Sequence, residues 1–143
     1  MQYGLIGEKL SHSFSKEIHE SIAGYKYELC EIPRGELDLF LKKRDFSAIN
    51  VTMPYKKEVI PYLDEISNTA DMLQAVNVIV NRDGKLVGYN TDYFGMRDLI
   101  NRANIDISNK KILILGTGGT SRTSHLVCKD LGASNIIFVS RVK

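Results

Sequence analysis

A glycine-rich turn around residue 116 is the feature of this sequence whose chemistry is easiest to state. The apolar run Lys111–Leu115 precedes the turn, and a segment of helical period follows it. A turn of this kind presents the free N–H groups and the dipole of a helix N-terminus to a pyrophosphate. Gly116 can form the tight turn and Gly118 lets the backbone approach the phosphates, whereas Ser121 replaces the usual third glycine. The predicted dinucleotide-binding residues of the turn are Gly116, Thr117, Gly118, Gly119, Thr120 and Ser121.

The turn alone also suits a plain strand-to-helix connection or a methyltransferase. If the turn binds a dinucleotide, the end of the next apolar run helps to distinguish NADP from NAD. NAD sites usually place an acidic residue at the end of the second strand, about 20 residues after the glycines. Here the run ends in Ser140 and Arg141. A guanidinium suits a 2′-phosphate, so Ser140 and Arg141 join the predicted cofactor site and NADP is favoured over NAD. The alternative is that Arg141 is a solvated strand end.

Four polar segments before residue 100 have residue types and an order that match a known family. They are residues 7–15 (GEKLSHSFS), 50–56 (NVTMPYK), 75–77 (AVN) and 88–95 (GYNTDYFG). In this order, and ahead of the glycine turn, they resemble the shikimate dehydrogenases. The resemblance covers essentially the whole chain. It implies an NADP-dependent enzyme that reversibly reduces 3-dehydroshikimate to shikimate, a step towards chorismate and the aromatic amino acids.

The ligand that the resemblance implies is a small ring bearing hydroxyls and a carboxylate. Ser13 and Ser15 lie where a predicted strand gives way to a helix, so their hydroxyls and the helix-start N–H groups suit the carboxylate. Thr52 ends a predicted strand, where side chains of α/β sheets face a ligand crevice. Asn77 and Asn90 offer donors and acceptors for ring hydroxyls. Taken one at a time, these residues also suit simple roles as helix caps or turn residues.

Lys56 and Asp92 are the pair that the resemblance assigns to catalysis, and both also belong to the predicted substrate site. They would meet the substrate hydroxyl that loses its proton as hydride leaves. A lysine exchanges a proton near neutral pH only when its ammonium form is disfavoured, mainly by desolvation. Lys57 follows directly, so the alternative is two solvated helix lysines. The context of residues 50–56 favours the catalytic role for Lys56 and not for Lys57.

The elements that must position these residues alternate between apolar runs of strand length and segments of helical period. We predict strands at 3–7, 25–32, 48–52, 76–81, 85–89, 111–115 and 135–139. We predict helices at 13–23, 35–43, 55–63, 68–73, 92–102 and 121–131. Asp83-Gly84 between two apolar runs predicts a hairpin. The alternation predicts an α/β fold with a mostly parallel twisted sheet flanked by helices.

Two domains are expected. Residues 1–92 would form the shikimate-binding catalytic domain, and residues 93–143 the start of a Rossmann-type NADP-binding domain. The polar stretch 101–110 is the best candidate for the junction between the lobes. Because the first βαβ unit has only just closed at Lys143, the second domain is expected to be truncated. A quinate/shikimate dehydrogenase using NAD, or an inactive fragment that retains only substrate binding, are the alternatives.

Composition limits the remaining possibilities. The net charge of +2 comes from 19 basic and 17 acidic residues that are scattered along the chain, which does not favour nucleic acid or a membrane as partner. The N-terminus lacks a signal-peptide pattern, so a cytoplasmic protein is expected. Neither the histidines nor Cys30 and Cys128 have metal-ligand spacing, so no metal is expected. Apolar strands in a truncated second lobe predict a possible homo-oligomer.

Overall fold

The chain folds into two compact units, one of residues 1–90 and one beginning at residue 91. The computed structural model describes residues 1–141. The second unit begins one residue before helix α4 (Asp92–Arg102), which packs on helix α5 (Gly119–Asp130) of the same unit. The predicted junction at residues 101–110 is therefore wrong, since that stretch lies inside the second unit.

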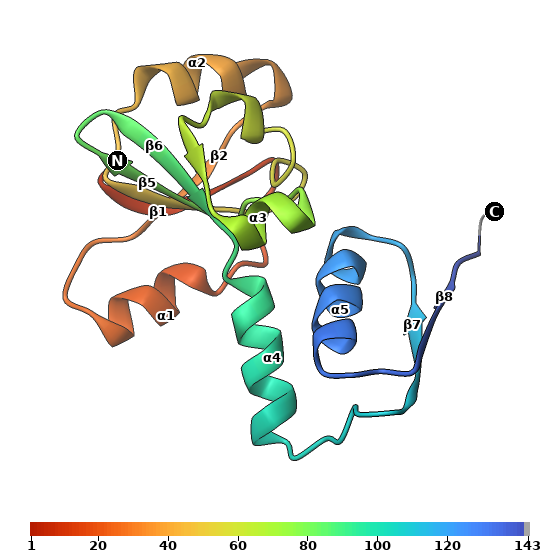
Figure 1. Ribbon diagram of the computed structural model, residues 1–143. Coiled ribbons are helices and arrows are strands. Elements are labelled where there is room, and N and C mark those ends of the chain that lie inside the picture. Colours follow the sequence, from red (N-terminus) through yellow and green to blue (C-terminus); the bar gives the residue numbers. More distant parts are fainter. Residues whose placement is uncertain (142–143) are drawn as a thin grey trace. The chain divides into compact units, whose positions relative to one another are not determined.

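The first unit is built on a six-stranded sheet in the order β2-β1-β3-β5-β6-β4 (Figure 1). Its strands are β1 (Tyr3–Gly7), β2 (Glu28–Glu31), β3 (Ala48–Val51), β4 (Glu65–Ile66), β5 (Val78–Arg82) and β6 (Lys85–Tyr89). Strand β5 runs antiparallel to both of its neighbours, and the other pairings are parallel. The predicted α/β fold with a mostly parallel sheet is confirmed.

Side chains alternate between the two faces of this sheet, and each face has its own apolar cluster. Helix α2 (Leu37–Lys43), which follows the 3-10 turn η1 (Arg34–Glu36), covers one face with Leu37 and Leu41. Helix α3 (Asn68–Leu73) adds Ala70 to the same cluster. Figure 1 shows α2 and the orange helix α1 (Ser15–Ile22) on opposite sides of the sheet. Full burial of one Leu or Ile side chain stabilises the fold by about 1.5–3 kcal/mol, so the cluster under α2 dominates the stability of this unit.

The hairpin between β5 and β6 forms as the sequence predicts. Asp83 and Gly84 have φ values of 52° and 89°, and Arg82 pairs with Lys85 across the turn. Two consecutive left-handed residues make the tight turn whose twist matches that of the flanking strands. Asn81 supports the turn because its side-chain oxygen accepts the backbone N–H of Gly84 at 2.9 Å.

The predicted helix at residues 55–63 is wrong. The segment forms consecutive turns that end in the 3-10 helix η2 (Ile60–Tyr62). Pro61 explains the difference, because it has no N–H to donate to residue 57 and its ring clashes with the carbonyl at that position in an α-helix.

The second unit contains α4 (Asp92–Arg102), β7 (Lys111–Leu115), α5 (Gly119–Asp130) and β8 (Asn135–Val139). Strands β7 and β8 pair in parallel around α5, as predicted for a βαβ unit. The Tyr93 hydroxyl donates to the Asp130 carboxylate at 2.6 Å and joins α4 to α5. Gly132 has a φ of 83° just after α5, in the predicted cap position.

The two strands of this unit are apolar but largely exposed. Leu113 is 57% exposed, Leu115 77% and Phe138 43%. Parallel sheets are normally covered on both faces, so the exposure leaves an apolar surface on β7 and β8. In the part of the chain that the structure describes, no helix is long and apolar enough to cross a membrane.

Candidate functional site

The polar residues predicted for the first unit gather at one edge of its sheet. Strands β1, β3 and β6 run in the same direction, so their carboxyl ends share this edge, and antiparallel β5 begins there. Ligands of open α/β sheets bind outside the carboxyl ends of the strands. Six predicted substrate residues follow or precede these strand ends: Ser13, Ser15, Thr52, Lys56, Asn77 and Asn90. We call this edge of the sheet, with these six residues, the polar edge.

Ser13 and Ser15 stand at the connection between β1 and α1. The Ser13 hydroxyl oxygen accepts the backbone N–H of Ser15, the first residue of α1, at 3.2 Å. Ser13 therefore has a local capping role, as its alternative interpretation predicts. Both side chains are half-buried and keep oxygens available at the start of the helix. The geometry is compatible with a carboxylate ligand at this helix start.

Thr52 continues the ladder of β3, because its backbone N–H donates to Ile6 on β1 at 2.9 Å. The Thr52 side chain lies against Gly7: a Cβ added to Gly7 would be 2.7 Å from the Thr52 methyl carbon. The glycine thus gives Thr52 the room that it occupies at the sheet edge.

Lys56 is held at the same edge by its backbone. The carbonyl of Lys56 accepts the N–H of Val76 at 2.7 Å, and Val76 directly precedes Asn77. Lys56 is half-buried, whereas Lys57 is exposed. The two adjacent lysines therefore differ in exposure, and Lys56 is the less exposed of the pair.

Asn77 and Asn90 are the most buried polar residues of the edge, 7% and 2% exposed. The backbone of Asn77 bridges two strands, accepting from Val51 at 2.8 Å and donating to Tyr89 at 3.0 Å. The Asn90 side-chain nitrogen donates to the carbonyl of Ala75 at 2.9 Å. Asn90 therefore fixes the loop ahead of Asn77, and both residues take part in further interactions. Buried amides need hydrogen-bond partners, and the two asparagines make this edge a polar surface.

Asn50 belongs to this surface and was missed by the sequence analysis. It lies on β3 two residues before Thr52, on the face that carries Leu5 of β1. Its side-chain oxygen accepts the hydroxyl of Tyr27 at 2.7 Å. Asn50 is the first residue of the segment 50–56 that carries the family resemblance, and asparagine is a residue type depleted inside strands.

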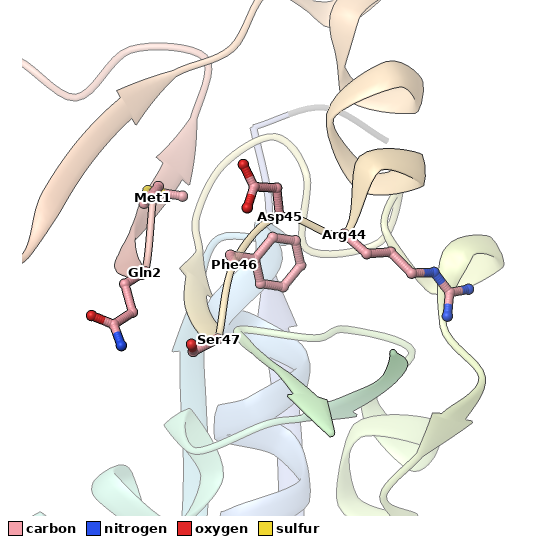
Figure 2. Close-up of a pocket in the computed structure, with 6 residues that line it drawn as sticks. All are labelled: Met1, Gln2, Arg44, Asp45, Phe46 and Ser47. Carbon is pink, nitrogen blue, oxygen red and sulfur yellow. The ribbon is translucent and has the colours of Figure 1, made fainter. Parts of the chain in front are cut away.

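A pocket of about 420 Å³ lies at the opposite edge of the same sheet (Figure 2). It is lined by Met1, Gln2, Arg44, Asp45, Phe46 and Ser47, where β1 and β3 begin. The Arg44 guanidinium is paired with the Asp64 carboxylate at 2.8 Å. None of the predicted site residues lines this pocket, so it is not the candidate site.

The glycine turn of the second unit has the geometry that a pyrophosphate needs. Gly116 has a φ of 105°, a conformation that favours glycine, and Gly118 precedes the first turn of α5 with extended backbone. A Cβ added at Gly116, Gly118 or Gly119 would meet no atom within 4 Å, which leaves open space beside the backbone. The Ser121 hydroxyl donates to the carbonyl of Gly118 at 2.6 Å, so the serine fits where the usual third glycine stands. These residues fit a dinucleotide phosphate group.

Ser140 and Arg141 follow β8 on the same side of this small sheet. The N–H of Gly116 donates to the carbonyl of Val139 at 2.8 Å, so the end of β8 lies beside the glycine turn. Arg141 is exposed. Both the turn and the cation predicted for a 2′-phosphate are thus at one edge of the second unit.

Asp92 is the first residue of α4 and belongs to the second unit. Its half-buried carboxylate stands in the first turn of the helix, where a negative charge is favoured by the helix dipole. Among residues 1–141, no group of three or more His, Cys, Asp or Glu side chains could hold a metal ion.

Comparison with known proteins gives a family for this geometry. The model of the shikimate dehydrogenase substrate binding domain matches residues 5–79, which include the strands of the polar edge up to the start of β5. The chain belongs to the shikimate dehydrogenase family. A curated NADP(+) shikimate dehydrogenase from Clostridium perfringens is 40% identical over 99% of this chain and 55% of its own length. The structure of shikimate dehydrogenase 1 from Peptoclostridium difficile is 40% identical, with a TM-score of 0.91 over 100% of this chain and 56% of the other.

Solved structures of the family carry ligands, as two examples show. The enzyme from Thermus thermophilus, in complex with NADP(H) and shikimate, is 29% identical, with a TM-score of 0.87 over 99% of this chain and 56% of its own. The enzyme from Listeria monocytogenes, in complex with shikimate and NAD, is 30% identical, with a TM-score of 0.88 over 100% and 53%. The chain spans about half the length of the relatives that it matches.

Proposed function

We propose that the chain serves NADP-dependent shikimate dehydrogenation, with the polar edge of the first sheet as its shikimate site. The observation that carries the proposal is the gathering of six predicted substrate residues at one edge of the sheet that the family model matches. Hydroxyl and amide groups on rigid strands and loops suit a small ring with several hydroxyls. Their rigidity also suits catalysis, because a fixed site orients the substrate without reorganisation.

The reaction removes a hydride from the carbinol carbon of shikimate and a proton from its oxygen. When bound, NADP⁺ supplies the hydride acceptor. Lys56 would take the proton from the hydroxyl, with the Asp92 carboxylate as its partner in the proton transfer. Ser13 and Ser15 would hold the ring carboxylate at the start of α1, and Thr52, Asn77 and Asn90 would orient the hydroxyls.

The cofactor side of the proposal rests on the second unit. The backbone of residues 116–121 would hold the pyrophosphate at the start of α5, and Arg141 with Ser140 would hold the 2′-phosphate. Titration of NADP⁺ and NAD⁺ against the chain and its Arg141→Ala variant tests this assignment. We expect the variant to lose NADP⁺ affinity about tenfold or more and to keep its NAD⁺ affinity. Equal losses for both nucleotides would remove Arg141 from the 2′-phosphate site.

Quinate/shikimate dehydrogenation with NAD is an alternative within the family, and the NAD in the Listeria structure is the observation that favours it. Arg141 argues against it, since NAD sites usually carry an acid at this place. Shikimate and quinate should each be offered with NADP⁺ and with NAD⁺. Reduction of NAD⁺ faster than NADP⁺ would overturn the proposed cofactor.

Substrate binding without turnover is the second candidate function. The family model for the substrate binding domain matches residues 5–79, in the first unit. In this case shikimate binds but the reduction of NADP⁺ stays at background. Calorimetric titration of shikimate, run beside the absorbance assay for NADPH, separates the two candidates.

Self-association and a cytoplasmic location are proposed as well. The exposed apolar side chains of β7 and β8, such as Leu113, Leu115 and Phe138, support self-association, because such surfaces tend to find partners. Sedimentation velocity over a range of concentrations tests it, and a monomer at all concentrations would contradict it.

A further inference from the structure

The loop that leads from β1 to the start of α1 is fastened to the rest of the first unit at Leu10. The Leu10 side chain is buried in the apolar cluster with Leu5 and Tyr27. Its backbone N–H donates to the Glu31 carboxylate at 2.7 Å, although the two residues are 21 positions apart. Glu31 is the last residue of β2, so a side chain of the sheet holds the middle of this loop.

Leu10 also begins the turn that leads to the two serines. Its carbonyl accepts the N–H of Ser13 at 2.9 Å, the bond that closes a four-residue turn. The Ser13 hydroxyl oxygen then accepts the N–H of Ser15, the first residue of α1. A continuous series of hydrogen bonds therefore runs from Glu31 through Leu10 and Ser13 to Ser15. We call residues 10–15 the serine turn.

A second carboxylate near this loop, that of Glu8, holds it less firmly. Glu8 pairs with Arg34 at 3.4 Å, and both side chains are exposed. Exposed ion pairs contribute little to stability. The Glu31 carboxylate accepts a backbone N–H, and such a charge-assisted hydrogen bond is about twice as strong as one between neutral groups. Loss of this acceptor would leave the N–H of a buried residue without its protein partner, which favours other conformations of the turn.

We propose that Glu31 is a positioning residue that fixes the serine turn for the carboxylate of the ligand. The inference rests on the proposed function, in which Ser13 and Ser15 hold the ring carboxylate of shikimate. Donors that are already in place bind a ligand more tightly, because no ordering of the loop has to accompany binding. Glu31 acts through the backbone of Leu10 and does not touch the substrate.

The test measures shikimate affinity by calorimetry in the full chain and the backbone amide signals of Leu10 and Ser13 by NMR. Glu31→Ala should weaken binding about fivefold to tenfold, because one charge-assisted hydrogen bond is lost, and should move both signals before any ligand is added. Glu31→Gln should bind within about threefold of the wild type, because the glutamine side-chain oxygen accepts the same N–H.

Glu28→Ala is the matched control. Glu28 lies on the same strand, and its carboxylate pairs with the exposed Lys26 at 3.8 Å and not with the loop. This variant should leave the affinity for shikimate and the signals of Leu10 and Ser13 unchanged. A loss equal to that of Glu31→Ala would assign the effect to the acidity of β2 and overturn the inference.

Wild-type affinity in Glu31→Ala, or unmoved signals of Leu10 and Ser13, would show that the carboxylate does not position the turn. Binding by Glu31→Gln as weak as that of Glu31→Ala would also overturn the inference, since the charge and not the acceptor would then matter. If Glu31→Ala does not fold, Glu31→Asp replaces it, because aspartate keeps the charge but is one carbon shorter. Glu31→Asp should lose affinity to a similar extent, and wild-type affinity would contradict the proposal. Absence of shikimate binding to the wild-type chain would instead remove the proposed function, and this inference with it.

Discussion

The backbone nitrogen of Val76 lies 2.7 Å from the backbone oxygen of Lys56 and donates a hydrogen bond to it. This bond joins the turns after β3 to the segment just before β5. Lys56 is therefore bonded to Val76, the residue that directly precedes Asn77. The lysine therefore belongs to the polar edge through its main chain. Lys57, its neighbour in sequence, has an exposed side chain at the same turn.

The first prediction follows from this difference between two adjacent lysines. In a protein of the relatives' full length that carries this chain, Lys56→Ala should lower the turnover of shikimate about a hundredfold or more. A positioned acid–base group contributes a factor of that order. The measurement is the rate of NADPH formation, with Lys57→Ala as the matched control. Near-normal turnover of Lys56→Ala would exclude the lysine from the mechanism.

The second prediction concerns Gly7 and the room that it leaves for Thr52. Gly7→Ala should weaken shikimate binding on the order of tenfold, because the new Cβ would lie 2.7 Å from the Thr52 methyl carbon and 2.8 Å from a Leu10 methyl carbon. Gly24→Ala is the control, since a Cβ there meets no atom within 4 Å. Calorimetry on both variants checks the prediction. Equal affinities would mean that Thr52 is not held in its place by Gly7.

The third prediction concerns pH and the carboxylate of Asp64. Its pKa is lowered, first by the hydrogen bond from the Leu86 N–H at 2.7 Å and then by the Arg44 guanidinium at 2.8 Å. A lowered folded-state pKa contributes stability above the unfolded value of 3.8, and that stability is lost as the pH falls through the folded pKa. Asp64→Asn should therefore unfold at lower urea concentration than the wild type at neutral pH. The difference should shrink as the pH falls below about 4.

Asp45→Asn is the control for that experiment. Asp45 is an exposed carboxylate next to Arg44, but among the described residues it has no ion pair with it. Its stability difference from the wild type should be small at every pH. A gap between Asp64→Asn and wild type that stays constant from neutral to acid pH would contradict the assignment of Asp64 as a charged, stabilising partner.

Most elements of the first sheet could be predicted because turn, cap and proline residues act on the backbone of their neighbours in sequence. Asp83-Gly84 demands left-handed backbone at two consecutive positions, and the hairpin follows from that. Ser67 caps α3 by accepting the N–H of Ala70, and the helix begins at Asn68 as its pattern predicts. At residues 55–63 a helical pattern contains Pro61, and the missing N–H decides against the helix.

Contacts between residues that lie far apart along the chain could not be predicted from the sequence. Phe14, Ile18 and Ile22 are spaced four residues apart at helix α1, as on one face of a helix, yet their side chains are 74%, 54% and 79% exposed. A period defines a face of a helix but not what covers it. Likewise, Asn50 was missed because its partner Tyr27 is 23 residues away in sequence and reaches it only through the folded sheet.

Amide NMR of the chain titrated with shikimate shows directly whether shikimate binds at the carboxyl edge of the first sheet. We expect the amide signals of six residues to shift: Ser13, Ser15, Thr52, Lys56, Asn77 and Asn90. Residues 44–47, in the pocket at the opposite edge, should not shift. Shifts confined to residues 44–47, or a spectrum that shikimate leaves unchanged, would show that shikimate does not bind at the carboxyl edge.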